Sequence, residues 1–350
     1  MLDRFRVGES SCCCCDDIPD NKFAQVKMRK NHMVFKHCKR DSPCDYHLLM
    51  SRVLEHDSEE ATDPKWKQAT LLTPSNPVSG AWNRDYAVDL AAKTGEPLFV
   101  VYAEDSRPRA RKKKDGSTEA REPLSRSHHR RLWELPDSKT EQRLGKLVLV
   151  RGMRVMLRIN EKGTELGLTN GAEGTVREIA LDPREILPSS AQVTPGGKPI
   201  VYRLRYMPKY VVVEFDRVDS TKPLTGMPSK LHIPVEPQQT NFKWSPNSKV
   251  KCWDINRTQL PLTPVKSLTV HMAQGRTLPI FVVDLDVTEM NPKDVIAQLY
   301  VILSRGQSLQ NLRVLRHFAH TVLHYRRGDG LKQEELRLYR LAQQTVMTFE

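Results

Sequence analysis

The hydrophobic pattern of this chain changes twice, and each change marks a border between two kinds of sheet. A strand pattern at 69–76, an amphipathic helix pattern at 78–95 and a second strand pattern at 97–105 follow one another early in the chain. Strands that alternate with helices are typical of an α/β sheet. From 146 to 255 the pattern is instead one of short strands punctuated by glycine, with an Asn-Gly pair that favours a hairpin. The α/β pattern then returns.

This double change predicts one α/β sheet domain that carries an inserted small β-barrel of SH3-like or OB-like type. We expect the strands at 69–73, 97–102 and 280–285 to share one sheet. The predicted division of the chain is an irregular N-terminal segment at 1–33, a first part of the sheet domain at 34–105, a basic linker at 106–145, the inserted barrel at 146–255, a second part of the sheet domain at 256–318 and a C-terminal helical tail at 319–350.

The charge balance points to a polyanionic partner. Lys and Arg total 55 against 42 acidic residues, which gives a net charge of +13. Such a balance favours nucleic acid first and acidic membrane surfaces second. The segment 106–131 is charged, contains proline and has no hydrophobic period, so we expect a loop or a disordered insert there. Basic side chains in it that are candidates for contacts with DNA phosphates are Lys112, Lys113, Lys114, Arg130 and Arg131.

Hydropathy and cysteine spacing exclude other classes. The sequence contains no run of 18 apolar residues and no apolar segment after a basic start, so we expect neither a membrane partner nor secretion. Four of the seven cysteines are consecutive, Cys12 to Cys15, and Cys38 and Cys44 do not have the spacing of a zinc pair. The sequence therefore predicts no metal site.

Two short stretches carry the chemistry. The first, "HMAQGRTL" at 271–278, places polar residues directly before the apolar run "PIFVVDLD", so these residues are expected at a sheet edge that faces a ligand. The second, "QLYVILSRGQSLQNLRVL" at 298–315, predicts an apolar helix that ends at Arg305. A guanidinium group in that position is suited to bidentate contact with phosphate. A lone arginine at a surface more often serves solubility. The presence of both stretches in one chain is what favours a role for Arg305 in binding phosphate.

Together the two stretches resemble motifs V and VI of superfamily 1 helicases. The resemblance is narrower to the Pif-type and RecD-like branch, which includes the helicase portion of Helitron transposons. "WKQATLLTPSNPVSGAWN" at 66–83 looks like the strand and helix after motif IV, and "LVRGMRVMLRINEKGTELGLTNGAEGTV" at 149–176 is similar to the barrel insert of that family. The resemblance covers roughly residues 35–318, in order.

This resemblance implies a fold, cofactors and partners. The fold is α/β, the second RecA-like sheet domain of the P-loop NTPase type, with a small SH3/OB-like β-barrel inserted into it. The family is an ATP-dependent DNA helicase that uses ATP and Mg²⁺ and acts on DNA, so single-stranded DNA is the implied partner. A nuclear location, or a mitochondrial one as in the family, is expected.

The resemblance also implies roles for individual residues. Carried over by position, Arg305 is the arginine finger that stabilises charge on the γ-phosphate. The nucleotide-binding candidates are Gln274, Gly275, Arg305 and, in "CKRD", Arg40 as the match to the motif IV arginine. The candidates for contact with the DNA backbone are His271 and Thr277, in addition to the lysines of the basic segment.

One departure from the family leaves the activity open. The sequence contains no G-x-x-x-x-G-K-[ST] loop and no Asp-Glu pair closing an apolar strand. Those elements cradle the phosphates and hold Mg²⁺, so neither ATP nor Mg²⁺ is expected to bind well to this chain alone. Three hypotheses follow: the second motor half of a DNA helicase that is inactive alone, a non-enzymatic nucleic-acid-binding module, or a helicase half completed in trans by a partner chain with a P-loop.

Overall fold

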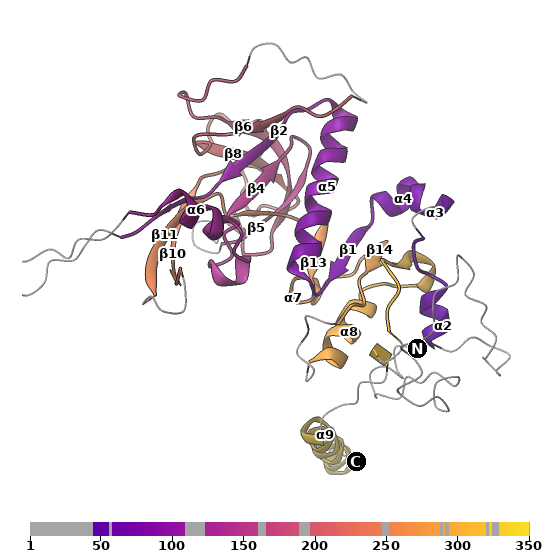
Figure 1. Cartoon of the computed structure of the whole chain (residues 1–350). Helices are drawn as coiled ribbons and strands as arrows, with labels where there is room; N and C mark the ends of the chain where they lie inside the picture. The colour runs from indigo at the N-terminus through magenta and orange to yellow at the C-terminus, as the bar shows by residue number, and fades with distance from the viewer. Residues whose placement is uncertain are drawn as a thin grey trace, which may run out of the picture. The chain divides into compact units, whose positions relative to one another are not determined.

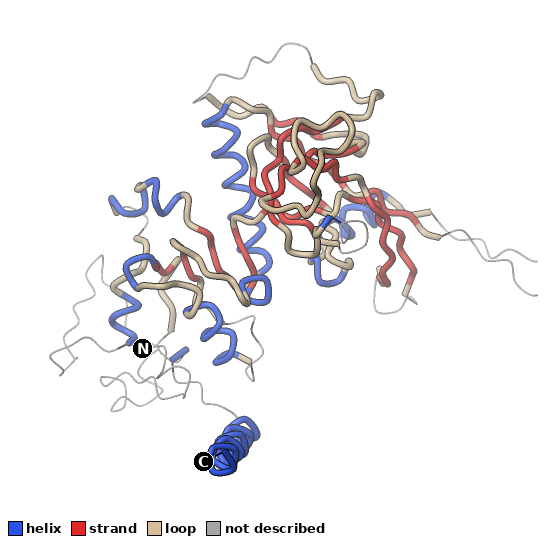
Figure 2. Tube along the Cα trace, turned by 180° about the vertical axis from the view of Figure 1, so that it is seen from behind, coloured by secondary structure: helices blue, strands red, loops and turns tan. Residues whose placement is uncertain are grey.

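The computed structural model describes residues 45–55, 58–108, 123–159, 166–188, 197–246, 252–287, 290, 294–319, 322–323 and 329–349. These residues fall into two compact units. Unit 1 combines the described residues up to Ser79 with those from Ser267 onward, and unit 2 is Gly80–Lys266. Figures 1 and 2 show the mixture of helices and strands in both units from opposite sides. The segment predicted to be irregular, 1–33, lies outside the described residues.

Unit 1 is built on a four-stranded parallel sheet with the order β13-β1-β14-β15. Its strands are β1 (Thr70–Thr73), β13 (Ser267–Thr269), β14 (Phe281–Val283) and β15 (Leu312–Val314). Most of the side chains on these strands are buried, as expected for a parallel sheet covered on both faces. The prediction that the strands near 69–73 and 280–285 share a sheet is confirmed, since Leu72 pairs with Val283.

In the sequence, the helices of unit 1 lie before the first of these strands, between the strands and after the last of them. They are α2 (Asp45–Met50), α3 (Glu59–Thr62), α4 (Pro64–Lys67), α7 (Val270–Ala273), α8 (Val295–Leu303), the 3-10 turn η4 (Leu309–Asn311) and α9 (Asp329–Phe349). In α9 several apolar side chains are exposed, among them Leu336 and Tyr339. In the part of the chain that is described, no helix combines the length and the apolar character that a bilayer crossing requires.

Helix α5 (Asn76–Thr94) begins in unit 1 and continues into unit 2, as the pattern at 78–95 predicts. Gly95 ends it, with φ at +73° and its N–H donating to the carbonyl of Ala91 at 2.9 Å. Ala87 and Ala91 are fully buried in the core of unit 2, and Tyr86 and Leu90 pack against the same core. The helix therefore places a small-residue stripe against the sheets.

Unit 2 contains strands in three sheets. A five-stranded antiparallel sheet has the order β12-β5-β6-β8-β9, a three-stranded sheet the order β4-β2-β7, and a ribbon the order β10-β11-β3. The bounds are β2 (Leu98–Tyr102), β3 (Glu104–Ser106), β4 (Lys146–Leu149), β5 (Arg154–Leu157), β6 (Glu173–Ala180), β7 (Val201–Arg203), β8 (Tyr210–Phe215), β9 (His232–Val235), β10 (Gln238–Trp244), β11 (Trp253–Gln259) and β12 (Leu262–Pro264).

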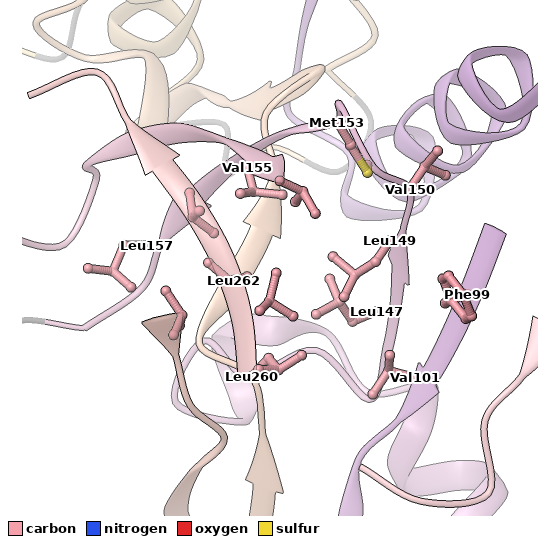
Figure 3. Close-up of a cluster of buried hydrophobic side chains, with 14 of the residues drawn as sticks. Phe99, Val101, Leu147, Leu149, Val150, Met153, Val155, Leu157, Leu260 and Leu262 are labelled. Atoms are coloured by element: carbon pink, nitrogen blue, oxygen red, sulfur yellow. The ribbon is translucent and has the colours of Figure 1, made fainter. Parts of the chain in front are cut away.

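The first two sheets share one apolar core. Figure 3 shows side chains from β2, β4, β5 and β12 turned toward one another in it. Leu147, Leu149 and Val155 have no exposed surface, and Leu260 and Leu262 are almost fully buried. The pairings thus give two sheets on a common core that also takes in β2 and β12, beyond the bounds 146–255 predicted for a barrel.

The prediction that the strand at 97–102 joins the sheet of 69–73 is wrong. Strand β2 runs antiparallel to β4 and parallel to β7, both in unit 2. The compact units divide the chain at Ser79 and Ser267. A short apolar run has the same sequence pattern in either sheet. The partner of a strand is determined by tertiary packing and not by the strand's own sequence.

Part of the segment that was expected to be a loop is helical. Helix α6 (Arg126–Trp133) begins inside the range 106–131 and extends two residues beyond it, and η2 (Asp137–Lys139) follows. The side chain of Ser125 accepts from the N–H of His128, and the His128 ring accepts from the N–H of Ser125. This reciprocal cap starts the helix, and the fully buried Leu132 anchors it. One buried leucine in a charged run gives too weak a periodic signal to be found from the sequence.

A buried ion pair joins the ribbon to α6. Arg257 and Asp105 are directly opposite on β11 and β3, and neither side chain has exposed surface. Arg257 Nε and Nη2 donate to the two oxygens of Asp105 at 2.7 and 2.9 Å. The remaining donors reach the carbonyl oxygens of Leu132 at 2.8 Å and Arg143 at 3.1 Å. The pair satisfies its hydrogen bonds internally, which a buried charge requires.

We predict that Asp105→Ala lowers the free energy of unfolding by about 3–5 kcal/mol, because it leaves the buried guanidinium of Arg257 without its counter-charge. Chemical denaturation followed by circular dichroism measures this loss. The matched control is Arg217→Ala, which removes an exposed pair with Asp219 and should cost less than about 1 kcal/mol. Equal losses in the two variants would contradict the assignment.

A second prediction concerns Lys266, whose side chain is half-buried over the ring of Tyr86. Burial, and then the positive charge of Lys93, lower the pKa of Lys266 from 10.5 to about 8. Between these two pH values the unfolded chain binds a proton that the folded chain has lost, so this group makes folding more favourable as pH rises. The free energy of unfolding of the unaltered chain, minus that of Lys266→Met, should therefore increase from pH 8 to pH 10. A flat difference would refute the burial of this amine.

Candidate functional site

The structure brings together the two stretches that carry the motifs. The backbone N–H of Leu278 donates to the carbonyl of Arg305 at 2.9 Å, and Leu278 forms a parallel bridge with Gly306. The guanidinium of Arg305 also donates through Nη1 to the carbonyl of Arg276 at 3.1 Å. Residues about thirty positions apart in the sequence therefore form one bonded patch of unit 1.

The partners of Arg305 are all neutral in the part of the chain that is described. Nε donates to the carbonyl of Val301 at 2.8 Å, and Nη2 donates to the hydroxyl of Ser304 at 2.8 Å. Arg305 is half-buried. Carbonyl and hydroxyl oxygens satisfy the N–H groups but do not neutralise the charge, so the guanidinium can still attract an anion. To contact a phosphate directly it would have to exchange some of these bonds.

The polar segment 271–277 turns sharply after α7. Gln274 ends the helix in an extended conformation, and its N–H donates to the carbonyl of His271 at 3.4 Å. Gly275 follows with φ at +78°. The side chains of His271, Gln274 and Thr277 are exposed. The turn therefore presents polar groups to solvent at one edge of unit 1.

The glycine at 275 is required by its backbone conformation and not by space. A Cβ built on Gly275 has no atom within 4 Å, whereas one built on Gly306 would overlap the ring of Phe281. The two glycines of the motif stretches thus have different physical reasons: a left-handed turn in one case and the close approach of β14 in the other. The second reason depends on tertiary packing.

A buried carboxylate at the end of β14 was not identified from the sequence. Asp284 has no exposed surface and accepts from the hydroxyl of Thr73 at 2.9 Å, at the end of β1. Arg316 donates to both of its oxygens at 2.9 Å and also approaches Asp286 at 3.1 Å. This network ties β1, β14 and the segment after β15 together. The signal in the sequence is an aspartate directly after a buried apolar run, "IFVVD".

Arg40 and the three lysines Lys112, Lys113 and Lys114 lie outside the described residues. Of the described residues, no three His, Cys, Asp or Glu side chains gather in a way that could hold a metal ion. The described patch therefore consists of the 271–277 turn and Arg305.

Comparison with known proteins finds similarity at the level of structure. No protein-family model matches the chain, and no curated protein matches it. A structure of forked-DNA unwinding by two coordinating Pif1 helicases covers 97% of this chain and 51% of its own, with 15% identity and a TM-score of 0.48. The Pif1 helicase from Candida albicans covers 97% and 57%, with 18% identity and a TM-score of 0.46. Bacteroides Pif1 bound to ssDNA covers 85% and 50%, with 15% identity and a TM-score of 0.47.

The chain is similar in structure to part of these Pif1 helicases. It spans about half of the length of each of them. At identities of 14–18%, no role of a residue in those structures is transferred to a residue of this chain.

We predict that Gly275→Ala destabilises the chain by about 1–2 kcal/mol, because a Cβ is strained at positive φ. Gly80→Ala is the matched control, since a Cβ there also meets open space but lies within α5 at ordinary helical angles. That control should be neutral or stabilising by up to about 1 kcal/mol. Thermal unfolding of both variants measures the difference. Equal midpoints would mean that the turn at 275 is not held in the left-handed conformation.

Proposed function

We propose that this chain is the second motor half of a Pif-type, ATP-dependent DNA helicase, and that it is inactive alone. The observation that carries the proposal is the bonded patch between the 271–277 turn and Arg305, joined through Leu278 and Arg276. Those are the two stretches whose residues resemble helicase motifs V and VI. A shared site requires them to be neighbours, and their separation in the sequence did not ensure that.

In this proposal the two units are a RecA-like domain and its insert. Unit 1 would be the RecA-like domain, which is supported by its all-parallel sheet. Unit 2 would be the inserted domain of SH3-like type, which is supported by its position in the sequence between Ser79 and Ser267 of unit 1. The family's location in the nucleus or in mitochondria is part of the proposal.

The roles of the site residues follow from their chemistry. Arg305 would stabilise charge on the γ-phosphate, since it is a permanent cation whose partners among the described residues are neutral. Gln274 and Gly275 would lie close to the nucleotide, and the exposed His271 and Thr277 would contact the DNA backbone. Single-stranded DNA is the proposed partner.

The chain does not offer a complete site for ATP and Mg²⁺. Its sequence has no phosphate-binding loop, and its described residues include no carboxylate cluster for a metal ion. A P-loop supplies backbone N–H groups for the phosphates and a hydroxyl for Mg²⁺. We therefore assign to this chain only the arginine and the polar turn. The other wall of the site would come from a further polypeptide segment or a partner chain.

The decisive test is ATP hydrolysis with and without a first motor half. We predict that the chain alone, with Mg²⁺ and single-stranded DNA, hydrolyses ATP at the background rate. A separately produced first motor half of a Pif-type helicase, with both Walker motifs, should gain DNA-stimulated ATPase activity when the chain is added. Arginine fingers contribute a factor of about 10³ or more to turnover, so Arg305→Ala should abolish the gain.

Two controls make this test specific. Arg203→Ala removes an exposed cation from β7 and should leave the stimulated rate unchanged. Arg305→Lys keeps the charge but loses the planar fork, and should restore little. Stimulated hydrolysis by the chain alone that Arg305→Ala abolishes would show a complete site and refute the proposal. No gain in the mixture would refute the motor role.

A non-enzymatic nucleic-acid-binding module is the second candidate. The net charge of +13 favours it, because phosphate contacts need no nucleotide. In that case the chain would bind single-stranded DNA with strong salt dependence and Arg305→Ala would have no effect on any ATPase partner. The two candidates share DNA as partner and differ in the role of Arg305.

A further inference from the structure

We infer that Thr73 and Asp284 are positioning residues, which hold the 271–277 turn in its place beside Arg305. The inference deepens the proposed function, on which its catalytic meaning rests, and all of its residues belong to unit 1. Both side chains are without exposed surface, so neither can touch a ligand directly. Their effect on the site must therefore pass through the strands that they join.

The turn and Arg305 are connected to strands on opposite sides of β1. The sheet order β13-β1-β14-β15 places β1 between β13 and β14, as Figure 1 shows. Strand β13 runs directly into α7 and the turn, whereas β14 is followed along the chain by α8 and then by Arg305. Among the described strands, β13 pairs with β1 alone. The place of the turn relative to Arg305 therefore depends on how β1 is fixed to β14.

The carboxylate of Asp284 makes that connection, since it accepts four hydrogen bonds from described residues on three segments. The hydroxyl of Thr73 donates to it at 2.9 Å, and the N–H of Asp286 donates at 3.2 Å. Arg316 supplies the other two, both of 2.9 Å, from the segment after β15. The Thr73 hydroxyl in turn accepts from the N–H of Ser75 at 3.1 Å. This buried group thus joins the carboxyl ends of β1 and β14.

Main-chain pairing alone fixes this edge of the sheet over a short distance. Strands β13 and β14 contain three residues each, and β1 pairs with each of them over three positions. The last position joins Thr73 to Thr269, the N-cap residue of α7. A shift of Thr73 would therefore move the start of α7, where His271 lies. The main-chain bond between Leu278 and Arg305 fixes only the far end of the turn.

Stability alone gives a weak reason for a carboxylate at this position. A buried charge must be desolvated, and apolar replacements of buried ion pairs are often neutral or stabilising. A carboxylate, in contrast, fixes several donors in direction as well as in distance. A catalytic constellation needs its groups held within about 0.5 Å of the productive geometry. A misplacement of about 1 Å can lower a rate on the order of 100-fold.

Hydrogen exchange of the whole chain, followed by mass spectrometry, tests the link without any need for activity. Thr73→Val replaces the hydroxyl by a methyl group and leaves Asp284 paired with Arg316. Peptides that cover 269–278 should then exchange about two- to tenfold faster, which is the effect of losing one hydrogen bond. Thr73→Ser keeps the hydroxyl and should retain the unaltered rate. Asp284→Asn offers Arg316 a single oxygen and should give at least the same increase.

The matched control is Glu60→Gln, which weakens another bidentate pair of unit 1. In that pair Arg313 on β15 donates to both oxygens of Glu60, at 2.9 and 2.8 Å, and joins β15 to α3 rather than to β1. Exchange in 269–278 should equal that of the unaltered chain, and circular dichroism checks that every variant is folded. An equal increase in the control, or no increase in Thr73→Val, would overturn the inference.

The mixture with a first motor half measures the catalytic consequence. Thr73→Val should lower the gain in DNA-stimulated ATPase activity about tenfold, since the turn is no longer held beside Arg305. Thr73→Ser and Glu60→Gln should retain the gain. A gain that Thr73→Val leaves intact refutes the positioning role alone, because its dependence on Arg305 still supports the motor proposal. The absence of any gain with the unaltered chain refutes the motor proposal, and the catalytic meaning of the link with it.

Discussion

The buried pair of Arg257 and Asp105 is the interaction on which the arrangement of unit 2 depends. A fully desolvated guanidinium is tolerable only where its nitrogens have acceptors, and each nitrogen of Arg257 has at least one, on three different segments. Those acceptors are the carboxylate on β3 and the carbonyls of Leu132 and Arg143. The same bonds that satisfy the charge therefore fix the ribbon, α6 and the chain before β4 in one geometry.

The exposed basic face of α6 is a consequence of that geometry. Because the carbonyl of Leu132 is bonded to Arg257 and its side chain is buried, the opposite face of α6 is turned to solvent with Arg126 and Arg130 on it. Strands β10 and β11 close the small core around Leu132 from the other side. A charged segment that looks like a linker in the sequence thus becomes a defined cationic face.

In unit 1 the arrangement depends instead on the pairing of parallel strands. The carboxylate of Asp284 is bonded to Thr73 and Arg316, so the ends of β1 and β14 are held together. Just after α8, Arg305 is connected to the 271–278 turn by one main-chain bond, from the N–H of Leu278, and by one side-chain bond to the carbonyl of Arg276. The two motif stretches are neighbours because parallel strands bring the segments around them to common edges of the sheet.

The sequence by itself determined several of the helices and strands, and which polar residues are candidates for chemistry. The apolar runs at 70–73 and 281–283 and the helix ended by Gly95 follow from local pattern and backbone preference. Only the tertiary structure decided that β2 pairs with β4 and β7, that Asp284 is buried, and that α6 carries an ordered basic face. Partner choice and burial depend on residues distant in the chain, here as far apart as Asp105 and Arg257, and a local pattern contains no information about them.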